Sequence, residues 1–393
     1  MKTGIDRISE HGVNKLFEGN RIALISAASG VSADYRYTTD IFSEKYNVTA
    51  LLSPEHGPRG VLGPGEKVKN GVDRFTGLKT YSLFEDFYAS TDEKEKDGAY
   101  MPSSEALREV DVVVFDMQDV GSRYFTYAST LFYAMKACSK RGLPLILLDR
   151  PNPIGGAVEG CCSCPEYLSF IGLTPVPIRH GMTLGELARY YNGQFGLGCE
   201  LTVVELTGWT RDTYFDETGL PFVRPSPNLP TFESVCFYNG TCMLAGTNVS
   251  EGRGTTQPFS LIGAPYIDPI TLADRLNADK SLSGVKFSPA FFRPEFSKLA
   301  GKTLYGVRVH VTDKRALKPV RLGVTMIKTV QELYPHDFEF TKPKTENGRY
   351  HIDLSTGNSD LRDGLLSADQ IMEKWNKDAK DFEEKRKKYL LYD

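Results

Sequence analysis

Apolar residues in the first half of the chain gather in short runs, with amphipathic stretches between them. The runs are rich in β-branched residues and too short for helices, and they occupy residues 21–26, 48–52, 112–115, 143–148 and 201–206. Such runs are typical of strands buried on both faces of a parallel sheet. Amphipathic stretches at 38–45, 126–141 and 183–192 predict helices. This alternation predicts an α/β fold with a doubly wound parallel sheet over residues 1 to about 200.

Local signals refine these boundaries and divide the chain. Gly142 is expected to stop the helix at 126–141, and Thr183 with Glu186 forms a capping-box pattern. We expect a short lead-in helix within residues 1–20, a long loop at 57–80 and a solvated insertion at 85–104. Beyond about residue 210 the sequence becomes loop-rich, with a strand predicted at 305–311 and helices at 316–334 and 368–389. We therefore predict an N-terminal domain at 1–215 and a smaller α/β domain at 216–393.

Composition and motifs exclude several classes of protein. The 393 residues carry a formal net charge of −3, which gives no electrostatic reason to expect a nucleic acid or a membrane as partner. The N-terminus lacks the apolar core of a signal peptide, and the seven cysteines are expected to be reduced thiols. We therefore predict a cytoplasmic protein, or an exported one if a leader has been removed. Nucleotide-binding glycine motifs are missing, so no cofactor is expected.

A metal is not expected either. Cys161 and Cys164 form a single CxxC pair, and no second pair at matching spacing accompanies it. His56 and His180 have acidic neighbours and remain possible ligands, but their spacing is not diagnostic.

Polar residues follow four successive predicted elements. In a parallel sheet these strand ends meet at one edge, where ligands bind in open α/β folds, so we expect a polar cleft there. Each group taken alone could equally be an ordinary strand exit with a solvated ion pair. The groups are Glu55 and His56, then Asp116, Gln118, Asp119, Arg123 and Tyr127, then Asp149, Arg150 and Asn152, and finally Arg179, His180 and Glu186.

This inventory suits hydrolysis of a polar substrate without a cofactor. Cleavage of a glycoside needs a proton donor and a second group that activates water or attacks the sugar. Glu55 is the candidate donor, because it follows an apolar strand that supplies desolvation; its alternative role is an ion pair with Arg59. Arg253 lies between two glycines in the loop SEGRGTT and could hold a carboxylate such as a lactyl group. Alternatively, that loop is merely solvated.

Seven segments together resemble the NamZ-like exo-β-N-acetylmuramidases, in order and over nearly the whole chain. They are SPEHGPRG (53–60), FDMQDVGSRYFTY (115–127), LDRPNPIGG (148–156), VEG (158–160), PIRHGMTLGELA (177–188), RPSPNLPT (224–231) and GTNVSEGRGTTQPF (246–259). The resemblance implies a Rossmann-like N-terminal domain, a smaller α/β C-terminal domain and an active site in the cleft between them. It implies release of N-acetylmuramic acid (MurNAc) from the non-reducing ends of peptidoglycan fragments, without a metal. The substrates would be muropeptides or disaccharides of MurNAc and N-acetylglucosamine (GlcNAc).

The resemblance also assigns expected roles within these segments. Glu55 would be the general acid, and Asp119 or Tyr127 would assist the water or the cation-like transition state. The expected substrate-binding and orienting residues are His56, Arg59, Gln118, Arg123, Arg150, Asn152, His180, Asn228, Asn248, Glu251 and Arg253.

The sequence departs from the family pattern at a few positions. Ala27 and Ala245 stand where the family usually has Asn and Glu, Phe125 stands where it often has Tyr, and cysteines occupy 161, 162 and 164. Ala27 and Ala245 favour a rival interpretation, in which the chain is a non-catalytic protein that binds or senses muropeptides.

Overall fold

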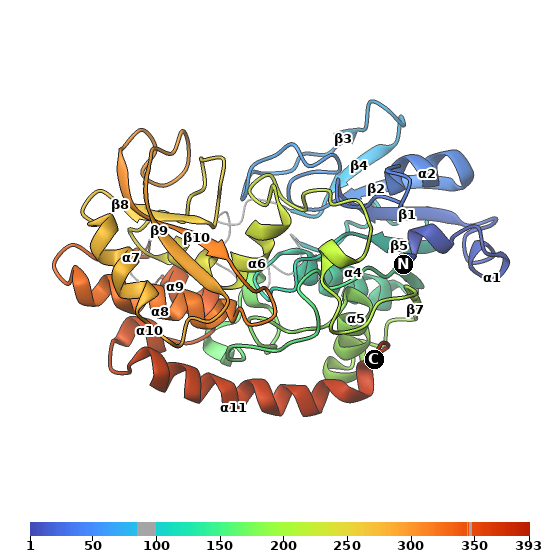
Figure 1. Cartoon of the computed structure of the whole chain (residues 1–393). Coiled ribbons are helices and arrows are strands. Elements are labelled where there is room, and N and C mark those ends of the chain that lie inside the picture. Colours follow the sequence, from blue (N-terminus) through green and yellow to red (C-terminus); the bar gives the residue numbers. More distant parts are fainter. Residues whose placement is uncertain (85–99, 344, 346–347) are drawn as a thin grey trace.

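The chain is built on two separate sheets, which lie in its two halves in the computed structural model (Figure 1). The structure describes residues 1–84, 100–343, 345 and 348–393. The larger sheet has seven strands in the order β3-β4-β2-β1-β5-β6-β7, and all but β3 run parallel. This arrangement confirms the predicted doubly wound sheet. The strands are β1 (Arg21–Ser26), β2 (Asn47–Ser53), β3 (Gly71–Val72), β4 (Lys79–Ser82), β5 (Val112–Asp116), β6 (Leu145–Leu148) and β7 (Leu201–Val204).

Alternate residues of the central strands serve opposite faces of this sheet, which explains their continuous apolar character. Ile22 and Leu24 pack with Phe42 on the face covered by α1 and α2. Ala23 and Ile25 face the other side, under α4 and α5. The helices of this half are α1 (His11–Asn14), α2 (Thr38–Lys45), α4 (Tyr127–Arg141) and α5 (Leu184–Phe195).

Two predicted helix signals are confirmed. Gly142 ends α4 in the left-handed conformation, with φ of 65°. The Thr183 side chain accepts from the Glu186 amide, and Glu186 bonds back to the Thr183 amide, so a capping box begins α5.

The smaller sheet is antiparallel, with the order β8-β10-β9 and strands β8 (Leu261–Ala264), β9 (Val285–Phe292) and β10 (Leu304–Val311). Helices α6 and α8 pack closely in this half because two glycines meet between them. A Cβ on Gly240 would lie 1.8 Å from the Pro319 carbonyl oxygen, so no larger residue fits. The helices here are α6 (Phe232–Thr241), α7 (Pro269–Asn277), α8 (Pro319–Leu333), α9 (His351–Thr356), α10 (Asp360–Asp363) and α11 (Ala368–Arg386).

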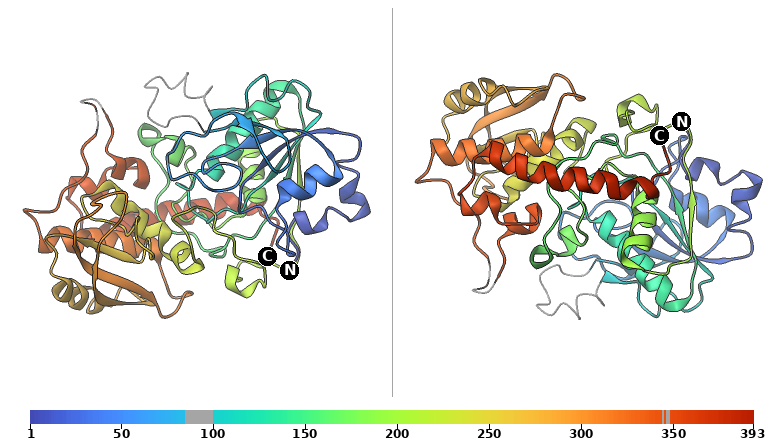
Figure 2. Two further views of the ribbon diagram at one scale, coloured as in Figure 1. Left: turned by 90° about the horizontal axis from the view of Figure 1, so that it is seen from above. Right: turned by 90° about the horizontal axis from the view of Figure 1, so that it is seen from below.

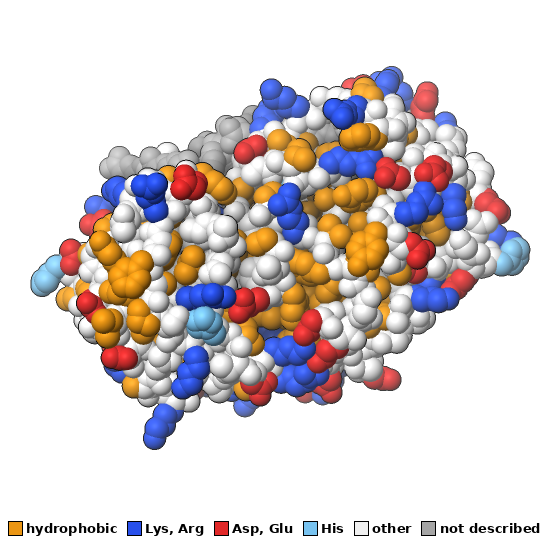
Figure 3. Space-filling model, turned by 45° about the horizontal axis from the view of Figure 1, so that its top comes forward, with side chains coloured by type: hydrophobic (Ala, Val, Ile, Leu, Met, Phe, Trp, Pro, Cys, Tyr) orange, Lys and Arg blue, Asp and Glu red, His pale blue; other side chains and the backbone are white. Residues whose placement is uncertain are grey.

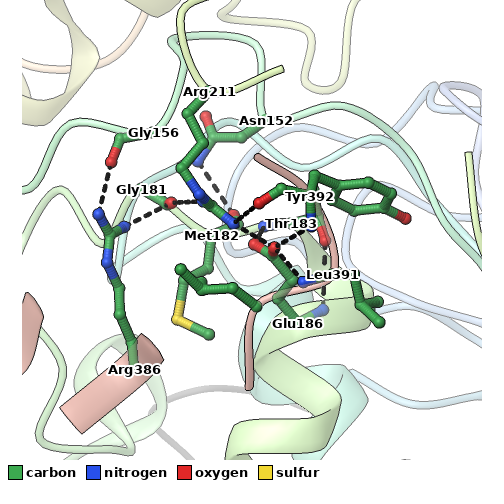
Figure 4. A network of polar contacts seen from close by, with 12 residues as sticks. Asn152, Gly156, Gly181, Met182, Thr183, Glu186, Arg211, Arg386, Leu391 and Tyr392 are labelled. Carbon is green, nitrogen blue, oxygen red and sulfur yellow. Dashed lines mark hydrogen bonds and ion pairs between the residues drawn. The ribbon is translucent and has the colours of Figure 1, made fainter. Parts of the chain in front are cut away.

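Helix α11 starts in the second half and returns the chain to the first, so both termini lie together (Figures 1 and 2). Figure 4 shows how its end is fixed: Arg386 donates to the backbone oxygens of Gly156 and Gly181. It also donates to the backbone oxygen of His180. The Glu186 carboxylate pairs with Arg211 and accepts from the Leu391 amide. The last residues of the predicted C-terminal domain therefore pack on the N-terminal half. The boundary at 215/216 stays a prediction.

Two local predictions differ from the structure, and a third is largely untested. Residues 1–20 contain a 3₁₀ turn at Ile5–Arg7 and the helix α1, so the predicted lead-in helix covers only four residues of this segment. The expected loop at 57–80 contains β3 and the start of β4, which extend the sheet at its edge. Of the insertion expected at 85–104, residues 85–99 lie outside the described part of the chain.

The surface and the helices agree with the composition. On the face drawn in Figure 3, side chains of both charges are interspersed and form no continuous basic area. None of the helices in the described part of the chain combines the length and apolar character needed to span a membrane.

Candidate active site

A cavity of about 280 Å³ lies between the two halves and takes its walls from both. Glu55 and His56 enter it from the end of β2, and Thr126 from the start of α4. Asn228 and Arg253 come from the two late loops at 224–231 and 246–259. The cavity therefore unites a carboxylate from the large sheet with a guanidinium from the second half.

Glu55 is buried and held by two hydrogen-bond donors. Its Oε1 accepts from the Gly65 amide at 2.8 Å, and its Oε2 accepts from the Thr126 hydroxyl at 2.6 Å. The Gly65 amide can only donate, whereas the Thr126 hydroxyl can donate or accept. A proton on Glu55 is therefore accommodated at Oε2. The alternative role for Glu55, an ion pair with Arg59, is not seen, since Arg59 bonds Asp40 and Asp73 instead.

The backbone after Glu55 is strained. His56 and Gly57 both have positive φ, 72° and 77°. Such a conformation at a non-glycine residue costs on the order of 1–3 kcal/mol and tends to occur at functional sites. The His56 Nδ1 lies 3.0 Å from the Leu62 carbonyl oxygen, a contact that fixes the turn. This turn aims Glu55 into the cavity.

Tyr127 positions a loop of the opposite wall. Its hydroxyl donates to the Pro225 carbonyl at 3.0 Å, three residues before Asn228. Burial and the nearby negative charge of Glu55 raise the pKa of Tyr127 well above its usual range, so the hydroxyl stays protonated. The Asn228 Nδ2 is buried without a hydrogen-bond partner among the described residues, and Asn228 lines the cavity. The loop thus offers an unused amide donor.

Three charges form a cluster at the cavity wall of the second half. The Glu251 carboxylate lies 2.7 Å from Arg253 Nη1 and 3.1 Å from Lys298 Nζ. Burial alone would raise the pKa of Glu251, but Lys298 and Arg253 lower it to about 2. The Arg253 guanidinium also stacks over Phe259, 5.1 Å from the ring centre, and its buried Nε has no partner in the described part of the chain. The cluster keeps one net positive charge, which suits an anionic ligand group.

Five of the predicted site residues form a polar network beneath the strand ends rather than the cavity wall. Arg150 pairs with Asp116 at 2.5 Å, deep in the sheet edge. Gln118 donates to the backbone oxygens of Asp119 and Pro151, and Asn152 donates to that of Met182. The His180 Nε2 lies 3.7 Å from Asp119 Oδ2. Gln118 and Arg150 do reach a second, much smaller pocket near Ser29.

Asp119 differs from the others in this network. Its Oδ2 accepts from the Gly121 amide at 2.7 Å, while its buried Oδ1 has no partner among the described residues. Asp119 does not line the cavity, but its charge acts on Tyr127.

The remaining predicted residues brace the cavity from outside. Arg123 donates to the carbonyls of Cys161, Val176 and Ser355 and so ties α9 to the large sheet. The Asn248 side chain bonds Asp337, Glu339 and Tyr266, away from the cavity.

Three residues of the cavity region were not singled out from the sequence. Thr126 lies inside the RYFTY segment, and that segment could have indicated it. Lys298 and His351 lie in segments without a recognisable motif. His351 lines the cavity, and Lys298 completes the charged cluster beside it.

No group of three His, Cys, Asp or Glu side chains suited to a metal occurs within the described ranges. Cys161 is buried against Thr356 and Asn358.

Comparisons with known proteins agree with this architecture. The family model "Exo-beta-N-acetylmuramidase NamZ, N-terminal" matches residues 22–233, and its C-terminal counterpart matches residues 236–392. The peptidoglycan beta-N-acetylmuramidase NamZ of Bacillus subtilis (strain 168) is 43% identical over 398 aligned residues, which cover 100% of this chain and 91% of that protein.

Two crystal structures share the fold, both of DUF1343 family proteins from Bacteroides fragilis NCTC 9343. One has a TM-score of 0.87 at 34% identity and covers 100% of this chain and 99% of that one. The other has a TM-score of 0.76 at 30% identity and covers 100% and 98%. The predictions of the fold class, of the family and of a glycosidase are confirmed. The chain belongs to the exo-beta-N-acetylmuramidase NamZ family.

Proposed function

We propose that this protein removes N-acetylmuramic acid from the non-reducing end of peptidoglycan-derived muropeptides or disaccharides, and that the cavity between its two halves is the active site. One observation carries the proposal: a buried carboxyl, Glu55, and a cationic cluster at Arg253 line the same cavity. MurNAc places a lactyl carboxylate on a sugar ring. A site for it therefore needs a cation in addition to a proton donor.

Glu55 is the general acid in this proposal. A neutral Glu55 protonates the glycosidic oxygen as the bond to the anomeric carbon breaks, and the leaving sugar departs as an alcohol. The strained turn at His56 and the two contacts from Gly65 and Thr126 hold the carboxyl in place. Asp119 is favoured over Tyr127 for the second role, in which its charge behind the cavity wall supports the cation-like transition state, because its Oδ1 is unused while the Tyr127 hydroxyl is engaged and stays protonated.

Arg253 binds the lactyl carboxylate, and Asn228 donates to a carbonyl of the substrate. The guanidinium has five N–H groups, of which Glu251 and Cys242 use two. Other predicted residues contribute indirectly, by holding the loops and side chains of the site; they are Arg123, Arg150, Asn152, His180, Asn248 and Glu251. The cytoplasmic location remains a prediction from the sequence.

A nitrophenyl β-glycoside of MurNAc tests the proposal. We expect release of nitrophenol, and much slower release from the GlcNAc glycoside, which lacks the lactyl group. Tight binding of MurNAc without any turnover of either glycoside or of a natural disaccharide would instead support the sensing protein. That rival is favoured by Ala245, which lines the cavity where the family usually has a glutamate.

A further inference from the structure

His351 is the first residue of α9, and its side chain forms part of the cavity wall. The helix cannot easily move. Arg123 of the large sheet donates to the Ser355 carbonyl at 2.8 Å. On its other side, a Cβ on Gly246 would lie 2.7 Å from the Ile352 nitrogen, so the two backbones are in close contact. The imidazole is therefore presented to the cavity from a fixed backbone.

The contacts of His351 determine which ring nitrogen carries the proton. The Ser355 hydroxyl donates its one proton to the His351 carbonyl at 2.9 Å. At its 3.3 Å contact with His351 Nδ1, Ser355 can then only accept, so Nδ1 bears the hydrogen. Burial, together with the charges of Arg253 and Lys298, lowers the pKa of His351 to about 4. The ring is therefore neutral at pH 7, and its Nε2 is a hydrogen-bond acceptor.

A hydrogen-bond acceptor beside a cationic cluster restricts which chemical groups of a ligand can bind at each position. The cation takes the lactyl carboxylate, whereas Nε2 repels a carboxylate and requires a donor. The lactyl ether is on carbon 3 of MurNAc, and its neighbours are the amide N–H on carbon 2 and the hydroxyl on carbon 4. His351 and Arg253 both enter the cavity from the second half of the chain, whereas Glu55 enters it from the large sheet. With the lactyl group at Arg253 and the scissile bond at Glu55, His351 therefore faces the side of the sugar away from that bond, which is the side of carbon 4.

On the basis of the proposed function, we propose that His351 Nε2 accepts a hydrogen bond from the free 4-hydroxyl of the terminal MurNAc. Within a glycan strand that oxygen is glycosylated and has no proton to donate. An acceptor at this place therefore distinguishes a chain end from a chain interior. His351 is a specificity-determining residue that contributes to the exo mode of action.

The test compares the nitrophenyl MurNAc glycoside with its 4-deoxy analogue. A site built to bond a hydroxyl discriminates against an analogue that lacks it, so wild type should prefer the natural glycoside by about 10- to 100-fold in kcat/KM. In His351→Phe that preference should fall to within about twofold, since no acceptor remains. His351→Gln supplies an amide oxygen at a similar reach and should restore part of it. As a matched control, His310→Phe should keep the full preference, because His310 lies on β10 and its ring contacts Ser288 of β9, outside the cavity.

Two results would overturn this assignment. One is equal turnover of both glycosides by wild type, and the other is a His351→Phe variant that loses activity but keeps the full preference. Calorimetric binding of MurNAc and 4-deoxy-MurNAc to the same variants gives the comparison independently of turnover. If wild type shows the preference in binding but cleaves neither glycoside, the proposed hydrolysis fails and the role of His351 stands.

Discussion

The two walls of the cavity handle charge in different ways. Among the described residues, the wall from the large sheet presents one carboxyl, Glu55, whose nearest partners are a backbone amide and a hydroxyl. The wall from the second half carries a cluster of three charged groups, in which the buried Glu251 pairs with the partly buried Arg253 and Lys298. Glu55 thus has neutral hydrogen-bond partners, whereas Lys298 and Arg253 lower the pKa of Glu251 and keep it ionised. The first wall is therefore suited to proton transfer and the second to recognition of a fixed anion.

The largest expected effect on activity comes from replacing Glu55, the proposed proton donor of the first wall. In Glu55→Gln the amide keeps the shape, with its oxygen toward Gly65 and its NH₂ toward the Thr126 hydroxyl, so the fold should be intact. Loss of a general acid typically costs about 10² to 10⁴ in rate. We expect that loss in kcat/KM on a natural disaccharide and a much smaller loss on the nitrophenyl glycoside, whose leaving group needs little protonation. Equal losses on both substrates, with unchanged thermal unfolding, would remove Glu55 from the role of acid and make Asp119 the next candidate.

The charged cluster of the second wall should make the free energy of unfolding depend on pH. The pKa of Glu251 is about 2 in the folded protein against 4.5 for the free side chain, so its contribution is present above pH 4.5 and is lost as the pH falls toward 2. The difference corresponds to roughly 3 kcal/mol of unfolding free energy. Glu251→Gln should therefore be less stable than wild type at pH 7, and the gap should narrow between pH 4.5 and 3.

Denaturant unfolding of both proteins from pH 7 to pH 3 measures this gap. Protonation of His351 also destabilises the fold as the pH falls from 6.5 toward about 4, and the Glu251 charge raises the pKa of His351. The comparison is therefore repeated in a His351→Phe background, where the difference between the two proteins reports Glu251. Glu44→Gln is the control, because Glu44 pairs with Arg36 on the surface. A gap that stays constant over the whole range would mean that Glu251 does not hold its charge through the cluster.

The secondary structure could be predicted from the sequence where its signals are local. β5 and α5 were predictable because an apolar run and a capping box are local signals. β9 was not predictable, because Pro289 and Lys286 interrupt the pattern of apolar residues expected of a strand. A proline fits in this strand because β9 lies at the edge of its sheet.

In the site, Glu55 and Arg253 sit in recognisable segments. Long-range contacts bring His351 to the cavity wall and Lys298 to the charged cluster beside it, such as those of Lys298 with the Leu244 and Val249 carbonyls. The sequence around Lys298 and His351 contains no motif that predicts those contacts. The residues that refine recognition are therefore the ones that local patterns leave out.

The smallest expected effect, and the sharpest test of the comparison, is on substrate preference. Arg253→Lys keeps the positive charge but loses the planar pair of N–H donors that can meet a carboxylate with two parallel hydrogen bonds. One lost bond to a charged group corresponds to about a 10- to 100-fold change. We expect that loss in kcat/KM for the MurNAc glycoside and almost none for the GlcNAc glycoside. The matched control is Arg362→Lys, because Arg362 also pairs with a carboxylate, Asp353 at 2.9 Å, and stacks on a ring, Tyr350 at 4.7 Å, but does not line the cavity. Its preference ratio should equal that of wild type. If Arg253→Lys slows the turnover of both glycosides by the same factor, then the cluster only stabilises the cavity wall and does not recognise the lactyl carboxylate. The proposed difference in function between the two walls would then be wrong.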